Sequence, residues 1–429
     1  TWMSGGVGNA LGNYDEMFFR TRVLENSRIY TAQGLESEGT TADFMSKANS
    51  YYYGTRFMSY LAHEYDPDRL MEWIKRKDGT KRGFAANFKH VFDINISKAW
   101  DNWIQFEKEF QNVNIKSLNE SVITEDKRIS DKVLGGVSHA FFDKKRNKIY
   151  VAVNYPGKVP HLASLDISTG KIKRLTDIKG PALFNVTSLA YDENNDFLFY
   201  TTDNSANRDL YSYNLKNGQN TLLQKNFRSG DLAYNKKDQS LWAVMHMNGI
   251  NTVIRIPKFN SENPNQYYSV WEQKYTLPYG HDIFDLDISP DGTKLSAAVA
   301  DYFGNQYLNI YDLASIDNVD KENIKFDEVF NFEVASPQTF KFTDDGKFLI
   351  GSSFYSGVSN IFRVNVENLE IEVMSNAITG YFRPIQIDSD RMLCFRYTSD
   401  GFAPVTVPNS PVDNVSSIEF LGNKTVQKH

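Results

Sequence analysis

A unit of roughly 45 to 55 residues recurs from about residue 130 to the end of the chain, and this repeat restricts the possible folds more than any other feature. Each unit contains a short strand, a polar turn, a long apolar strand, a second turn and a third strand. The clearest copies begin at Phe284 and Thr339, and weaker copies begin near His139, Ser188, Asp231 and Pro384. Periods of this size are typical of propellers and solenoids, whose units bury their strands against neighbouring units.

Six copies predict a six-bladed β-propeller. The turns are rich in Asp, Asn and Lys, which suit tight hairpins that need a positive φ angle or a capped backbone. The segment Ser121–Ser130 resembles the outer strand Thr169–Thr176 of the first unit, but it precedes that unit. We expect it to pair with the last blade, because this pairing removes an exposed sheet edge and closes the ring.

The first hundred or so residues show a helical period instead. An amphipathic helix is expected over Ser46–Glu64, followed by helices over 68–76 and 84–92 and by a last helix that Ser97 caps. The charged run Glu107-Lys108-Glu109 is interpreted as a solvated helix face. The period stops near Asn112. The expected organisation is therefore a helical domain (1–112), a linker with the closing strand (113–130), the propeller (131–420) and a C-terminal tail (421–429).

Composition excludes several classes of protein. The net charge is −6 and no stretch concentrates Lys and Arg, so a nucleic-acid partner is not expected. Cys394 is the only cysteine, which excludes an internal disulfide and a cysteine-rich zinc site. No apolar run has the length of a membrane helix, so no membrane span is expected within the chain. The chain begins without Met or a signal peptide, which suggests a processed or excised piece.

The turns at Ser289–Gly292 and Thr343–Gly346 resemble the WD-like repeats of TolB-type bacterial propellers. The helical part resembles the C-terminal half of a gluzincin-type metallopeptidase. In that family a His-Glu-x-x-His helix is followed by a Trp-x-x-Glu-Gly segment, which supplies the third zinc ligand, and by a Tyr-x-x-Gly motif. Trp2–Gly6 resembles the second element, with Gly5 at the position of the ligand Glu, and Tyr51–Gly54 resembles the third.

The departures from that family argue against catalysis by the chain as given. His63-Glu64 is the only His-Glu pair, and it lacks the second His that would share one helical face. Gly5 offers no side-chain ligand. No metal site or cofactor is therefore expected, and zinc would require ligands upstream of Thr1. Tyr51 matches the tyrosine that stabilises the oxyanion in active relatives, which makes it a weak catalytic candidate. A packed helix aromatic is the simpler interpretation.

Candidate binding residues are charged or ionisable side chains near the starts of the inner strands and on neighbouring strands. Strand ends of this kind can line the central channel of a propeller, where ligands bind. The candidates are His139, Asp231, His281, Asp282, Arg383 and Arg396. Ordinary strand-end hydrogen bonding is the simpler alternative for each of them.

The resemblance implies a non-catalytic binding or scaffolding module of a bacterial cell-envelope protein, on the periplasmic or another extracytoplasmic side. Its partner would be a protein, a peptide or an envelope component. The alternative is part of a zinc metallopeptidase whose His-Glu-x-x-His helix lies upstream, with the propeller controlling access of substrates. A third possibility is that Ile418–Gly422 leads into a further domain.

Overall fold

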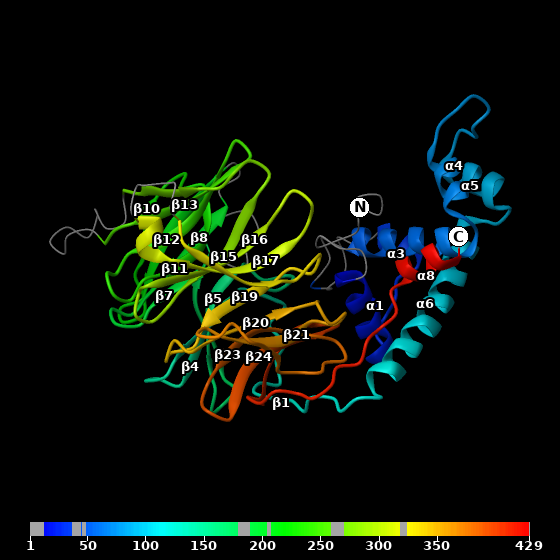
Figure 1. Cartoon of the computed structure of the whole chain (residues 1–429). Coiled ribbons are helices and arrows are strands. Elements are labelled where there is room, and N and C mark those ends of the chain that lie inside the picture. Colours follow the sequence, from blue (N-terminus) through cyan, green and yellow to red (C-terminus); the bar gives the residue numbers. More distant parts are fainter. Residues whose placement is uncertain are drawn as a thin grey trace.

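Six antiparallel sheets form a closed ring in the computed structural model, and helices cover one end of the ring (Figure 1). The structure describes residues 13–36, 44, 49–178, 189–203, 207–258, 270–317 and 324–428. The predicted fold class, a six-bladed β-propeller with N-terminal helices, is confirmed.

The blades follow one another along the chain. The first contains β2 (Gly136–Val137), β3 (Phe141–Asp143), β4 (Lys148–Asn154), β5 (His161–Asp166) and β6 (Ile172–Asp177). The second contains β7 (Leu189–Asp192), β8 (Phe197–Asp203), β9 (Arg208–Asn214) and β10 (Asn220–Gln224). The third contains β11 (Ser229–Tyr234), β12 (Leu241–Met247), β13 (Ile250–Ile256) and β14 (Glu272–Thr276). The fourth contains β15 (Asp282–Ile288), β16 (Lys294–Ala300), β17 (Gln306–Asp312) and β18 (Phe326–Asn331). The fifth contains β19 (Gln338–Phe342), β20 (Phe348–Ser353), β21 (Asn360–Asn365) and β22 (Ile371–Val373).

The sixth blade combines both ends of the repeat array. Its strands β23 (Tyr381–Gln386), β24 (Arg391–Thr398) and β25 (Gly401–Pro408) are joined by β1 (Lys127–Arg128), which pairs antiparallel with β25. Arg396 on β24 donates hydrogen bonds to both carboxylate oxygens of Asp126 at 2.9 Å. Asp126 also accepts a hydrogen bond from the Tyr381 hydroxyl at 2.9 Å. The expected pairing of the 121–130 segment with the last blade is therefore confirmed, and it closes the ring.

Neighbouring blades share their apolar cores. Trp242 and Val244 of the third blade pack in one buried cluster with Ile283, Leu295 and Ala297 of the fourth. Both faces of the central strands are consequently covered, which explains why β4, β8 and β12 read as continuous apolar runs rather than as alternating patterns.

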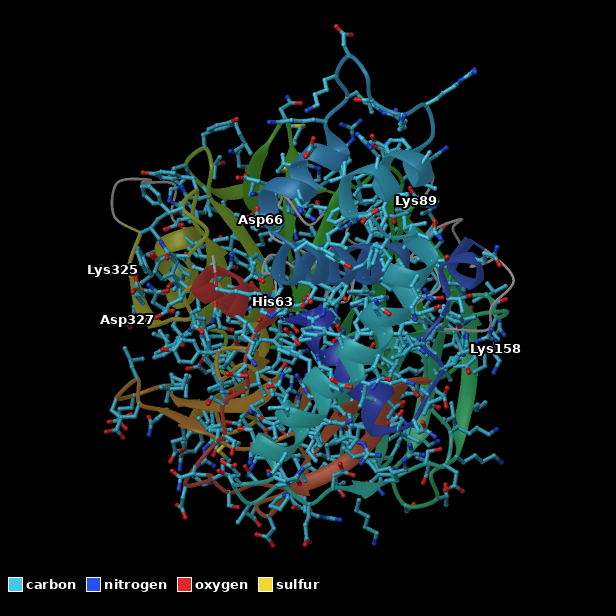
Figure 2. All side chains as sticks on the ribbon, turned by 90° about the vertical axis from the view of Figure 1, so that its right-hand side faces the viewer. His63, Asp66, Lys89, Lys158, Lys325 and Asp327 are labelled. Atoms are coloured by element: carbon cyan, nitrogen blue, oxygen red, sulfur yellow. The ribbon has the colours of Figure 1, made fainter. Side chains whose placement is uncertain are left out.

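The helices are α1 (Tyr14–Leu24), α2 (Ala32–Glu36), α3 (Asn49–Glu64), α4 (Pro67–Ile74), α5 (Phe84–Phe92), α6 (Ile96–Leu118), α7 (Leu313–Asp317) and α8 (Leu421–Lys428). Asp66 caps α4 by accepting a hydrogen bond from the Asp68 N–H. All except α7, which follows β17, lie at the helical end of the molecule, and Figure 2 looks onto this end. No helix in the described ranges is both long and apolar enough to span a membrane.

Three expectations for the helical part are wrong. The N-cap of α6 is Asn95 rather than Ser97, and the helix continues to Leu118 instead of stopping near Asn112. Its last turns are buried by distant residues: the Asn114 side chain exchanges two hydrogen bonds with the backbone of Glu419. Glu107 is fully buried rather than solvated, because its carboxylate accepts hydrogen bonds from the guanidinium of Arg56.

The C-terminal segment, which the sequence predicts to be a tail, contains a helix that packs on the helical unit. Residues 421–428 form α8, which lies beside α3 (Figure 1). Leu421 is fully buried, and its N–H donates a hydrogen bond to Glu16 of α1 at 3.1 Å. The helical unit is thus completed by the end of the chain.

The helix α1 joins the helical unit to the propeller. Met17 is buried in a cluster that contains Val137, Phe354 and Phe382 of the blades. Arg20 donates a hydrogen bond from Nε to the Ile378 carbonyl at 2.7 Å. The carboxylate of Glu25 accepts hydrogen bonds from the backbone N–H and the hydroxyl of Ser399, in the turn between β24 and β25. These contacts lie where the inner strand β23 begins, so α1 covers that end of the ring.

Candidate functional site

The inner strands of the third to sixth blades each have a bulge near the propeller axis. The pairing of inner strand and second strand shifts by one residue between Gly230 and Ala233, between Phe284 and Asp287, between Gln338 and Lys341, and between Phe382 and Ile385. The residue after the first of each pair has a positive φ: Asp231, Asp285, Thr339 and Arg383. Bulges of this kind redirect a side chain, and they are common next to functional sites.

His139 takes the same place in the first blade, between β2 and β3. We call these five residues, His139, Asp231, Asp285, Thr339 and Arg383, the axial ring. None of them is more than 7% exposed to solvent.

Hydrogen bonds of the axial ring run from blade to blade. The N–H of Asp285 donates to Oδ1 of Asp231 at 2.9 Å, and the N–H of Thr339 donates to the carboxylate of Asp285. His139 forms a hydrogen bond through Nε2 with the carbonyl of Leu189 in the second blade. The side chains of Asp231, Asp285 and His139 therefore link neighbouring blades at the axis.

Burial dominates the electrostatics of the ring. It raises the pKa of Asp285 to about 7; the Thr339 N–H opposes this rise and the nearby Asp231 adds to it. Burial also lowers the pKa of Arg383. The pKa of His139 lies well below its usual value because of burial and the charge of Lys341.

The helical end of the axis is covered by Tyr14 of α1. Its ring lies 5.5 Å from that of Phe354 and 6.1 Å from that of Phe382, measured between centroids. On the same side, the guanidinium of Arg383 lies 4.8 Å from the ring centroid of Phe402. The axis is therefore closed at this end.

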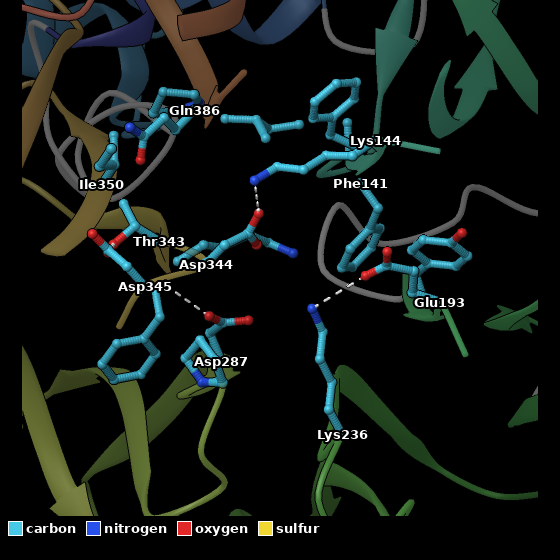
Figure 3. Close-up of a pocket in the computed structure, with 18 of the residues that line it drawn as sticks. Phe141, Lys144, Glu193, Lys236, Asp287, Thr343, Asp344, Asp345, Ile350 and Gln386 are labelled. Carbon is cyan, nitrogen blue, oxygen red and sulfur yellow. Dashed lines mark hydrogen bonds and ion pairs between the residues drawn. The ribbon is translucent and has the colours of Figure 1, made fainter. Parts of the chain in front are cut away.

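A cavity of about 610 Å³ opens at the other end of the inner strands (Figure 3). All six blades contribute to its wall. One lining residue from each blade, in chain order, is Phe141, Tyr191, Lys236, Asp287, Lys341 and Gln386. The wall thus combines aromatic, amide, acidic and basic groups.

Two ion pairs lie in the wall of this cavity (Figure 3). Lys144 of the first blade contacts Asp344 of the fifth at 2.6 Å, and Lys236 of the third contacts Glu193 of the second at 3.6 Å. Both pairs are partly exposed. Asp287 instead accepts a hydrogen bond from the backbone N–H of Phe342 at 2.8 Å. Charged groups of both signs therefore surround the opening.

The structure brings together only some of the residues that the sequence singles out. His139, Asp231 and Arg383 belong to the axial ring. His281 and Asp282 lie where β15 begins, outside the cavity wall, and His281 lies edge-on to Tyr302. Arg396 binds Asp126 in the closing segment and does not line the cavity.

The peptidase-like features that the structure describes do not form a site. Tyr51 is 55% exposed on α3, whereas its neighbours Tyr52 and Tyr53 are buried. Gly5 and the rest of Trp2–Gly6 lie outside the described residues, as does Ser188. Within the described ranges, no group of three or more His, Cys, Asp or Glu side chains could hold a metal ion.

Sequence reasoning did not single out Asp285, Asp287 or Lys341. The signal for them is present in the clearest repeats. Phe-Asp-Leu-Asp-Ile (284–288) places two charges within one inner strand, and Phe-Lys-Phe (340–342) places one charge between two aromatic residues of another. Charges at these positions are unusual, because both faces of an inner strand pack against neighbouring blades.

No family model and no curated protein matches the sequence. Solved structures with similarity include TolB from Acinetobacter baumannii, with a TM-score of 0.41 and 12% identity over 76% of this chain and 73% of that chain. Oligogalacturonate lyase from Vibrio parahaemolyticus has a TM-score of 0.41 and 10% identity over 67% of this chain and 98% of that one. The PQQ-bound aldose sugar dehydrogenase from Streptomyces coelicolor has a TM-score of 0.44 and 11% identity over 66% and 98%. The similarity is one of fold.

Proposed function

We propose that the propeller is a non-catalytic binding module whose axial cavity receives a peptide or an exposed segment of a partner protein. The observation that carries this proposal is a cavity walled by all six blades, open at one end and closed towards the axial ring. Its volume of about 610 Å³ lies in the range of pockets that enclose small ligands.

The chemistry of the wall suits a polypeptide. Aromatic side chains such as Phe141 and Tyr191 offer apolar contact area, and Tyr also offers a hydroxyl. The pairs Lys144–Asp344 and Lys236–Glu193 are partly exposed, and exposed pairs contribute only about 0–1 kcal/mol. An incoming peptide can therefore replace one member of each pair at little cost in free energy.

Two further statements stay predictions from the resemblance. One is the extracytoplasmic location in a bacterium. The other is the peptidase alternative, because the Gly5 segment on which it depends lies outside the described residues.

The proposal is tested with an array of synthetic peptides probed with the full chain. Gln386→Trp places a bulky ring at the cavity wall, and Gln273→Trp makes the same change on the outer strand β14. Peptides that bind the unaltered chain should bind the Gln386→Trp variant at least tenfold more weakly and the Gln273→Trp variant equally well. Thermal melting checks that both variants fold. The proposal would be refuted if no peptide binds, or if the peptides that bind have the same affinity for the Gln386→Trp variant as for the unaltered chain.

A further inference from the structure

Lys341 differs from the other lysines of the cavity wall. Lys144 and Lys236 each form an ion pair, whereas the ammonium of Lys341 forms no ion pair or hydrogen bond with any residue that the structure describes. Its ammonium lies 3.5 Å from the ring centroid of Phe141. Lys341 is on β19, between the axial ring and the mouth of the cavity, so it lies inward of the paired lysines.

The two carboxylates that influence the charge of Lys341, those of Asp287 and Asp285, form hydrogen bonds with backbone N–H groups instead. Asp287 accepts the N–H of Phe342, and Asp285 accepts the N–H of Thr339. Both influence Lys341 electrostatically, but neither lies within ion-pair distance of its ammonium. The fixed carboxylates therefore stabilise the backbone of the inner strands and leave the ammonium without a direct counter-ion.

A half-buried ammonium has lost part of its hydration, and contact with an aromatic face compensates for only part of that loss. The ammonium carries three N–H donors, and an aromatic face engages them weakly compared with a charged oxygen. An oxygen anion in the cavity would supply the missing acceptor.

We infer that Lys341 is the anion-binding group of the cavity and that it takes a carboxylate of the ligand. This inference rests on the proposed function. The closed inner end of the cavity favours the end of a polypeptide over its middle, so the C-terminal carboxylate is the first candidate and an acidic side chain is the second.

The site itself is tested with acetate as the probe. The full chain, labelled with ¹³C at Cε of lysine, is titrated with sodium acetate and, at equal ionic strength, with sodium chloride. One lysine resonance should shift saturably with acetate only, and Lys341→Met should remove this resonance, while Lys144→Met should leave it in place. Shifts shared by all lysines, or a saturable shift that belongs to another lysine, would overturn the inference.

The source of the carboxylate is tested with peptides from the array, each made with a free C-terminal carboxylate, with a C-terminal amide, and as an amide with one added Asp. Amidation should weaken binding about tenfold, as expected for loss of one charged hydrogen bond. Lys341→Met should have the same effect on the acid and none on the amide, and Lys341→Arg should retain binding. If the amide with the added Asp regains the lost affinity, the carboxylate that Lys341 binds can be that of a side chain.

The two proposals fail separately. Saturable acetate binding at Lys341 without any peptide binder would refute the peptide proposal and retain the anion site. Peptides that bind equally as acid and as amide, and equally to Lys341→Met, would retain the binding module and refute the role of Lys341.

Discussion

Arg56 lies at the centre of a buried polar network in the helical unit. Its Nη1 contacts Glu16 at 2.6 Å, and its Nε and Nη2 contact the two oxygens of Glu107 at 3.1 and 2.9 Å. Gln111 donates to both carboxylates. All four side chains are buried, and they join α1, α3 and α6. Such a network stabilises a fold only when every member is present.

Arg56→Met should therefore lower the free energy of unfolding by about 3–5 kcal/mol, because it leaves Glu16 and Glu107 buried without their counter-charge. Urea denaturation followed by circular dichroism measures the change. Lys77→Met is the matched control: Lys77 pairs with Glu72 at 3.4 Å with both side chains mostly exposed, so its loss should cost less than about 1 kcal/mol. Equal effects of the two substitutions would show that the network contributes no more than a surface pair.

At the scale of secondary-structure elements, α8 should matter although it is short and terminal. Leu421→Ala removes a fully buried side chain between the helices and should cost about 2–5 kcal/mol. Val426→Ala alters the same helix at a position that is 81% exposed, and it should have almost no effect. Thermal melting of the two variants separates the possibilities. A C-terminal segment that acts only as a tail would make both substitutions equally harmless.

The sequence predicts elements well where the information is local. The sequence predicts the position of the inner strand in all six blades, because alternating side chains and turn residues are properties of the segment itself. The end of α6 and the burial of Glu107 were missed because their partners are distant. Arg56 is 51 positions from Glu107, and Glu419 is 305 positions from Asn114. From the sequence alone, a charged side chain is expected to be exposed to solvent, because a distant counter-charge that would allow its burial cannot be identified.

The candidate site was predicted in part for the same reason. His139, Asp231 and Arg383 stand at the starts of repeats, so the sequence places them near the axis. Arg396 has the same charge as Arg383, but its strand is the second of the blade and its partner, Asp126, comes from the closing segment. Distinguishing the two arginines requires knowledge of which strand is innermost.

At the scale of the whole molecule, the axial ring should make stability depend on pH. Burial raises the pKa of Asp285 to about 7, so the folded chain holds a proton there that the unfolded chain loses near pH 4. The unfolded state then binds fewer protons between these values, and the free energy of unfolding should fall as pH rises, by about 1.4 kcal/mol per pH unit from this group.

Asp285→Asn isolates this contribution, because Asn keeps an acceptor for the Thr339 N–H but cannot ionise. The stability of the unaltered chain relative to this variant should decline from pH 5 to pH 7 in urea titrations. Asp166→Asn is the control: hydrogen bonds from Ser168 and Thr169 lower the pKa of Asp166, so this carboxyl is ionised in both states over that range. Its relative stability should stay constant. A constant difference for Asp285→Asn would contradict the expected burial effect.

The docking of α1 and α8 on the same side of the ring also fixes how the molecule can be presented to its surroundings. The helix α8 lies at the helical end, whereas the cavity opens at the other end of the inner strands. A tether attached to the exposed face of α8, for example at Val426, would therefore hold the molecule with its cavity facing the medium. A probe attached there would stay clear of an arriving ligand.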